Sequence, residues 1–129
     1  MEAGWRYLTD TILHDSETKM IILAGPRQSG KTTLSRALNT DHEYLNFDID
    51  RHRQIIRKQV WDRRKKLIIF DELHKMPKWK NWLKGLVDDE DVKQRIVVTG
   101  SARLETFRKT GDSLAGRYFQ YRLHPYDLK

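Results

Sequence analysis

One stretch near the amino terminus constrains the fold of this chain more than any other. An apolar run over residues 20–24 passes directly into Gly25-Pro-Arg-Gln-Ser-Gly30-Lys31-Thr32, which fits the pattern G-x-x-x-x-G-K-[ST], and a helix-like pattern follows. A phosphate-binding loop occupies this place between a buried strand and a helix. We therefore expect an α/β fold that is organised around this loop.

Each fixed position of the loop has a physical role in holding an anion. Gly25 and Gly30 admit backbone angles that are closed to other residues, so successive N–H groups can turn inward. Lys31 is expected to reach the β- and γ-phosphates, and the Thr32 hydroxyl to ligate Mg²⁺. The alternative is a plain glycine turn followed by a solvated lysine. The residues predicted to bind the nucleotide are Gly25, Pro26, Arg27, Gln28, Ser29, Gly30, Lys31, Thr32 and Thr33.

The composition agrees with one domain that binds an anion. The 129 residues suffice for a single core, and 25 Lys and Arg against 18 Asp and Glu leave a net charge of +7, which suits a nucleotide, a nucleic acid or an acidic protein. The absence of cysteine excludes a disulfide scaffold and a thiolate metal site. No apolar run approaches the roughly 20 residues that span a bilayer, and the amino terminus lacks a signal-peptide core. We expect no membrane partner and a cytoplasmic location.

Short apolar runs alternate with helical patterns along the chain. Such an alternation is typical of a parallel sheet with helices on both faces, a three-layer sandwich that binds ligands at the carboxyl ends of its strands. We expect one domain over 1–129, with a helix and link over 1–18 and the core over 19–129. The expected strands are 20–24, 44–48, 67–70, 96–98 and 118–123, and the expected helices are 4–13, 33–39, 48–66, 79–87 and 103–109.

A pair of carboxylates follows the apolar run of residues 67–70. Asp71 and Glu72 have the form of a Walker B element, in which a buried strand carries an acid to the rim of the sheet. Asp71 can hold Mg²⁺ opposite Thr32, and Glu72 can orient the water that attacks the γ-phosphate. A kinase would have less use for the second acid, so the pair favours hydrolysis, although alone it can be a plain turn.

Two further regions supply candidates for the γ-phosphate. Thr99 and Ser101 follow the fourth expected strand, where either hydroxyl can contact the phosphate or the water, or simply form a bend. Arg117 precedes the last strand and can face a phosphate in its own or a neighbouring subunit, or form a surface salt bridge. The predicted catalytic residues are Lys31, Glu72, Ser101 and Arg117, and the predicted metal ligands are Thr32 and Asp71.

A basic stretch raises a competing function. The expected helix over 48–66 can contact DNA, which would make the chain a nucleotide-gated DNA-binding module with little turnover. A charged helix face is, however, usually only solvated. The five histidines have no ligand spacing, so we expect no zinc site. The basic residues are Arg51, Arg53, Arg57, Lys58, Arg63, Arg64, Lys65 and Lys66.

Five motifs together resemble the prokaryotic AAA-type P-loop ATPases, in particular the AAA_14 group, whose members usually carry a C-terminal DUF4143 region. These motifs are GPRQSGKTTL, YLNFD, LIIFDELHKMPKW, VVTGSARL and LAGRYFQYRLHPYDL. The resemblance implies an AAA+-like core with sheet order 5-1-4-3-2, ATP with Mg²⁺, a sensor at Ser101 or Thr99, and a family GR element at Arg117. It also implies a helical lid and a C-terminal region, which we expect to be absent from a chain that ends at Lys129.

The expected function is therefore Mg-dependent ATP binding and hydrolysis. We expect this core to couple its nucleotide state, ATP or ADP, to a C-terminal module or a partner that the chain lacks, with weak turnover in isolation. A homo-oligomer is one arrangement in which Arg117 would reach a phosphate.

Overall fold

Five parallel strands form a single sheet in the structure, a computed structural model that describes residues 2–26, 30–100, 114 and 116–123. The strands are β1 (Met20–Ala24), β2 (His42–Asn46), β3 (Leu67–Asp71), β4 (Arg95–Gly100) and β5 (Tyr118–Arg122). Their order in the sheet is β2-β3-β4-β1-β5. Read from the other edge, this is 5-1-4-3-2, so the expected sheet is confirmed.

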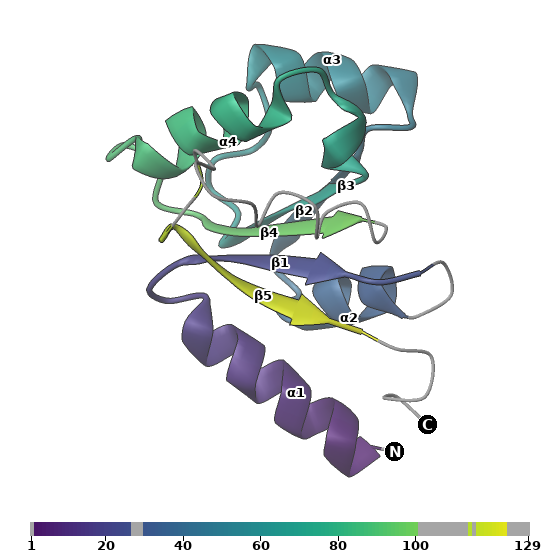
Figure 1. The fold of residues 1–129 in the computed structure, drawn as a ribbon. Helices are drawn as coiled ribbons and strands as arrows, with labels where there is room; N and C mark the ends of the chain where they lie inside the picture. Colours follow the sequence, from purple (N-terminus) through teal and green to yellow (C-terminus); the bar gives the residue numbers. More distant parts are fainter. Residues whose placement is uncertain (1, 27–29, 101–113, 115, 124–129) are drawn as a thin grey trace.

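Helices cover both faces of this sheet (Figure 1). One face carries α1 (Glu2–Asp15) and α2 (Lys31–Ala37), and the other carries α3 (Asp50–Lys58), the 3₁₀ turn η1 (Leu73–Lys75) and α4 (Trp79–Asp88). Ile21 and Leu23 of β1 join the core beneath α1 and α2, whereas Ile22 and Ala24 join the core on the α3 and α4 side. This alternation produces the expected three-layer sandwich, because successive residues of a strand point to opposite faces.

Aromatic rings fill the centre of the core beneath α4. Trp61, Phe70 and Trp82 meet edge to face, with ring centroids 5.2–6.1 Å apart. Leu83 and Leu86 of α4 are buried against the same core. The apolar residues of α4, which follow one another at helical spacing, therefore face the core: Trp79, Trp82, Leu83, Leu86 and Val87.

The helix expected over 48–66 is wrong in its second half. Helix α3 ends at Lys58 because Gln59 adopts a left-handed conformation, with φ 54°, and its N–H bonds back to the carbonyls of Ile55 and Ile56. The chain beyond it turns inward and buries Trp61, which is only 4% exposed. Tertiary burial of one aromatic side chain thus overrides the helical pattern of the charged residues around it. The strand expected over 44–48 also moves, to His42–Asn46.

The parallel register brings the ends of four strands to one edge of the sheet. Ala24 pairs with Gly100, Asp71 with Thr99, and Asn46 with Asp71. The residues that follow β1, β2, β3 and β4 therefore share this carboxyl edge, which is where an open α/β sheet binds its ligands.

Candidate functional site

The loop after β1 is held at both ends. The Gly25 N–H donates to the carbonyl of Gly100, at 3.2 Å, which ties the beginning of the loop to the end of β4. Gly30 closes the loop in the left-handed region, with φ 88°, a conformation that disfavours any side chain. Pro26 and Thr33 are exposed beside these anchors. The predicted nucleotide contacts Arg27, Gln28 and Ser29 lie outside the residues that the structure describes.

Lys31 brings a buried positive charge to this loop. The residue is 7% exposed, and the Lys31 Nζ lies 3.4 Å from the carbonyl oxygen of Pro26. Among the described residues, the Lys31 ammonium makes this one contact, which is long and has a neutral acceptor. A buried charge without an ionic partner is costly, so the position fits a lysine that receives an anion such as a phosphate.

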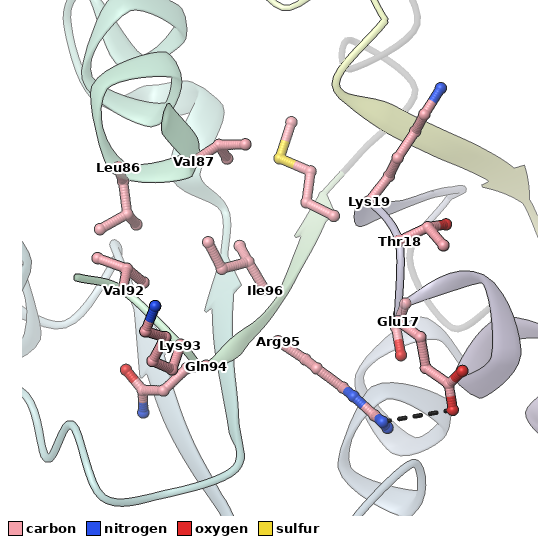
Figure 2. A pocket seen from close by; sticks show the side chains of 12 residues that line it. Glu17, Thr18, Lys19, Leu86, Val87, Val92, Lys93, Gln94, Arg95 and Ile96 are labelled. Carbon is pink, nitrogen blue, oxygen red and sulfur yellow. Dashed lines mark ion pairs between the residues drawn. The ribbon is translucent and has the colours of Figure 1, made fainter. Parts of the chain in front are cut away.

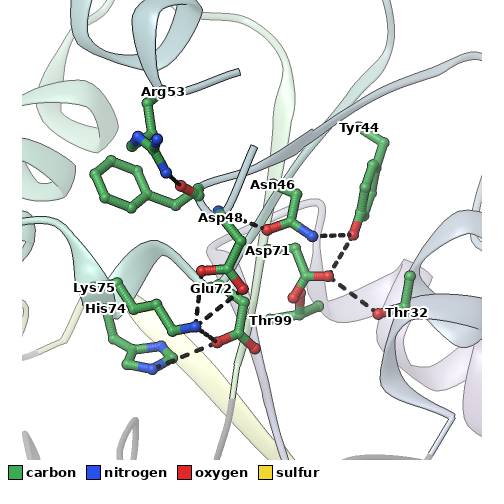
Figure 3. Close-up of polar contacts among 11 residues, drawn as sticks. Thr32, Tyr44, Asn46, Asp48, Arg53, Asp71, Glu72, His74, Lys75 and Thr99 are labelled. Atoms are coloured by element: carbon green, nitrogen blue, oxygen red, sulfur yellow. Dashed lines mark hydrogen bonds and ion pairs between the residues drawn. The ribbon is translucent and has the colours of Figure 1, made fainter. Parts of the chain in front are cut away.

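Asp71 is oriented by three hydroxyl groups from three elements (Figure 3). Thr99 Oγ1 donates to Oδ1 at 2.7 Å, and Thr32 Oγ1 donates to Oδ2 at 3.2 Å. The hydroxyl of Tyr44 also donates to Oδ2, and Asn46 Nδ2 donates to that hydroxyl at 3.4 Å. Burial, and then the bond to Asp71, raises the pKa of Tyr44, so the phenol stays protonated and remains a donor.

The donor set of Thr32 and Asp71 fits Mg²⁺. A hydroxyl and a carboxylate 3.2 Å apart are hard oxygen ligands, and magnesium in phosphate-transfer proteins is bound by one or two carboxylates together with the phosphates of the substrate. No group of three or more His, Cys, Asp or Glu residues that could hold a metal occurs in the described part of the chain. These residues therefore fit a metal that is shared with a bound phosphate.

Glu72 projects from a turn beside Asp71. Its backbone is left-handed, with φ 61° and ψ 26°, and its N–H donates to the Thr99 carbonyl at 2.9 Å. The side chain is 19% exposed, and its Oε2 lies 3.3 Å from Lys75 Nζ and 3.7 Å from His74 Nε2. The hydrogen bond between Lys75 and Asp48 raises the pKa of Lys75, which keeps the ammonium charged. The two predicted Walker B acids thus differ in their surroundings. Asp71 accepts hydrogen bonds from hydroxyl groups, whereas the Glu72 carboxylate lies beside Lys75 and His74.

The sequence reasoning missed three residues of this cluster. All three lie inside motifs that resemble the family, but nothing in their spacing indicates that Tyr44 bonds Asp71, that Asn46 bonds Tyr44, or that Lys75 contacts Glu72. Thr99 is fully buried and bonds Asp71. Ser101, the other candidate sensor, lies outside the described residues.

Arg117 is not brought to this cluster within its own chain. It precedes β5, and the register pairs the first residue of β5, Tyr118, with Met20 at the start of β1. Arg117 therefore lies at the amino edge of the sheet, a strand length of roughly 16 Å from the edge that carries the loop. There it forms a two-pronged ion pair with Asp88, at 2.8 and 3.1 Å, which lowers the pKa of that carboxyl. This ion pair matches the surface salt bridge that the sequence leaves open as the alternative for Arg117.

Much of the basic stretch is also engaged locally. Arg53 pairs with Asp50, Arg64 with Asp62, and Lys65 with Asp41. Arg63 lies over the ring of Trp61. Because the last four basic residues fall beyond the end of α3, they do not form the continuous helical face that the DNA-binding hypothesis requires.

A hollow of about 290 Å³ lies at the opposite edge of the sheet (Figure 2). The turn after α1, the end of α4 and the start of β4 line it, and an ion pair of 3.5 Å between Arg95 and Glu17 lies on one side. It is therefore separate from the Asp71 cluster. None of the helices that the structure describes is both long and apolar enough to cross a membrane.

The sheet order, the glycine loop after β1 and the two acids at the end of β3 define the class of P-loop, AAA-type nucleotide-binding cores. Sequence comparison specifies the family. Residues 17–129 match the AAA_14 family, described as an AAA domain, and the chain belongs to that family.

Two relatives and one solved structure extend this result. Uncharacterized proteins of Mycobacterium tuberculosis and Mycobacterium bovis are each 33% identical over 102 residues, which is 76% of this chain but 23% of theirs. This chain thus spans less than a quarter of their length. The crystal structure of a DNA polymerase III gamma subunit-related protein from Thermotoga maritima matches 94% of this chain and 46% of its own, with a TM-score of 0.56 and 15% identity. That likeness supports the fold alone.

Proposed function

We propose that this chain is a Mg-dependent ATPase core. The observation that carries the proposal is the burial of Lys31, whose ammonium contacts only the Pro26 carbonyl among the described residues, next in sequence to Thr32, whose hydroxyl bonds Asp71. A triphosphate would supply the anion that Lys31 does not find among the residues that the structure describes. Its phosphate oxygens would also complete the ligand set of a metal ion that Asp71 holds through a single protein carboxylate.

Each residue of the cluster then has a defined task. Lys31 binds the β- and γ-phosphates, Thr32 and Asp71 hold the metal, and Glu72 orients the attacking water. Magnesium, when bound, neutralises charge on the phosphate oxygens. Thr99 keeps Asp71 in place, and Ser101 is proposed as the second polar contact to the γ-phosphate. The main chain of residues 25–33 forms the cradle.

A neighbouring subunit is part of the proposal. Arg117 lies at the far edge of its own sheet, so a catalytic role for it requires a nucleotide that is held by a second copy. We also propose that the nucleotide state of this core acts on a further module or partner. DNA binding by the basic stretch is not favoured, because three of its eight basic residues pair with nearby acids and the last four lie beyond the end of α3.

Glu72→Gln tests the assignment of the water-orienting acid. The variant keeps the size and polarity of the side chain but removes its charge. We expect ATP affinity, measured by calorimetry, to stay within about threefold of wild type, and phosphate release to fall about 100-fold or more, because general-base catalysis contributes this much. Glu90→Gln, in an exposed loop, is the matched control and should retain activity. Phosphate release by Glu72→Gln at the wild-type rate would remove Glu72 from the mechanism.

A further inference from the structure

Lys75 bridges two carboxylates at the carboxyl edge of the sheet (Figure 3). Its Nζ lies 2.7 and 3.0 Å from the two oxygens of Asp48, and 3.3 Å from Oε2 of Glu72. The contact with Asp48 is therefore the shorter and two-pronged one. Asp48 anchors the ammonium, and the ammonium in turn contacts Glu72.

Local backbone geometry sets up this bridge. Glu72 takes a left-handed conformation, and a single turn of 3₁₀ helix follows, closed by the Lys75 N–H bonded to the Glu72 carbonyl at 3.1 Å. This turn places Lys75 on the same side as the carboxylate three residues before it. Asp48 reaches the same point from the end of β2, because Phe47 N–H bonds to the carbonyl of Asp71 and extends the pairing with β3.

Both neighbours of the Glu72 carboxylate contact the same oxygen. Lys75 Nζ and His74 Nε2 lie 3.3 and 3.7 Å from Oε2, the nearer oxygen in both pairs, and Oε1 accepts no hydrogen bond from the residues that the structure describes. A glutamate side chain that is 19% exposed has several rotamers open to it, and each misplaced rotamer moves the oxygen that must contact a water. An ion pair on one oxygen restricts these rotamers and leaves the other oxygen available.

We propose that Lys75, anchored by Asp48, is a positioning residue that holds Oε2 of Glu72 so that Oε1 is presented to the attacking water. This inference rests on the proposed ATPase function. Lys75 itself does not contact the reacting atoms. Lys75 affects the reaction by orienting Glu72, and Asp48 affects it by orienting Lys75.

Lys75→Met tests the proposal directly. It keeps the aliphatic stem and removes the charge. We expect kcat for ATP to fall about 10- to 100-fold, because a catalytic group displaced by about 1 Å costs that much, while KM and ATP affinity stay within about twofold. Lys75→Arg should recover at least a third of the wild-type kcat. The matched control is Lys65→Met, since the Lys65 side chain is similarly exposed, at 39% against 43%, and pairs with Asp41 away from both Glu72 and Arg117, so its kcat should not change.

Two further variants separate positioning from a structural role. Asp48→Asn should lower kcat as well, by less than Lys75→Met, with KM unchanged. The double exchange of Asp48→Lys with Lys75→Asp restores opposite charges between the two positions but sets a carboxylate beside Glu72. If the ion pair between positions 48 and 75 is only structural, kcat should recover when the double exchange restores that pair. If Lys75 positions Glu72, kcat should stay low.

The outcomes distinguish this inference from the proposed function. If the wild-type chain releases no phosphate from ATP, the proposed function fails and the inference fails with it. If the wild-type chain hydrolyses ATP and Lys75→Met or the double exchange does so at the same rate, only the inference is overturned. A kcat loss confined to Lys75 and Asp48, with ATP affinity and the thermal unfolding midpoint retained, supports it.

Discussion

Asp71 is held by hydroxyl donors from α2, β2 and β4, so its position depends on three separate elements at once. When a metal is bound, the Thr32 hydroxyl is expected to turn toward it, which leaves Thr99 and Tyr44 to orient the carboxylate. Groups that hold a metal ligand in this way typically change metal affinity when they are removed. Tyr44 is the member of this set whose contribution can be removed without altering the phosphate loop.

Tyr44→Phe removes one hydroxyl and leaves the ring in place. We expect the Mg²⁺ concentration that gives half-maximal phosphate release to rise roughly tenfold, because the Asp71 carboxylate loses a donor that orients it. The measurement is a Mg²⁺ titration of steady-state activity at saturating ATP. Tyr7→Phe, at a residue that is 75% exposed, is the control. An unchanged Mg²⁺ requirement in Tyr44→Phe would show that the bond has no part in holding the metal.

At the scale of elements, Gln94 fixes the path of the chain between α3 and β3. The residue is 9% exposed, its Oε1 accepts from Trp61 Nε1 at 2.9 Å, and its Nε2 donates to the carbonyls of Asp62 and Lys65, at 2.9 and 2.8 Å. One amide thus satisfies a buried indole and two backbone acceptors. These bonds hold the segment after Lys58 against the start of β4.

Gln94→Leu keeps the volume of the side chain and removes all three bonds. We expect the free energy of unfolding to fall by about 2–4 kcal/mol, because a buried N–H and two carbonyls lose their partners. Denaturant titration with guanidinium gives the value. Gln54→Leu, on the exposed face of α3, should stay within about 0.5 kcal/mol of wild type. Equal stabilities of the two variants would contradict the role assigned to Gln94.

The same elements show what can be predicted from the sequence. Strands β1, β3 and β4 can be found because each is a short run of buried apolar residues with a polar residue or turn at its end, whereas β2 and β5 are largely half-buried; the sheet order follows from the family resemblance. The end of α3 cannot be predicted from the local sequence, because it depends on a hydrogen bond between Trp61 and Gln94, which are 33 residues apart. Lys31, Thr32 and Asp71 lie together as their motifs predict, whereas the bond between Tyr44 and Asp71 spans 27 residues and leaves no local pattern.

At the scale of the whole molecule, the predicted catalytic residues lie at two opposite edges of the sheet. The carboxyl edge carries Lys31, Asp71 and Glu72, and the amino edge carries Arg117 and its partner Asp88. The position of Arg117 is fixed by the parallel direction of β5, which the spacing of the motifs does not determine. If a second copy of the chain supplies Arg117 to the nucleotide, activity must depend on association between copies.

Phosphate release per subunit should therefore rise with protein concentration in the wild-type chain. In Arg117→Ala we expect a lower and concentration-independent rate, because an arginine supplied by a neighbour stabilises charge on the transferring phosphate. Arg51→Ala, which removes an exposed charge from α3, should follow the wild-type curve. Two results would exclude a role for Arg117 in a neighbouring subunit. One is a wild-type rate of phosphate release per subunit that stays constant as protein concentration rises, and the other is a concentration dependence of Arg117→Ala that matches wild type.

The most direct test of the central claim is steady-state phosphate release from ATP by the wild-type chain and by Lys31→Ala, each measured with Mg²⁺ and after its chelation. We expect release by the wild-type chain only with Mg²⁺, and none above background from Lys31→Ala in either condition, because the proposed site needs both the buried ammonium of Lys31 and a metal ion to neutralise the phosphates. Release that persists at the same rate without Mg²⁺, or in Lys31→Ala, would contradict the assignment of this edge as a Mg-dependent ATPase site.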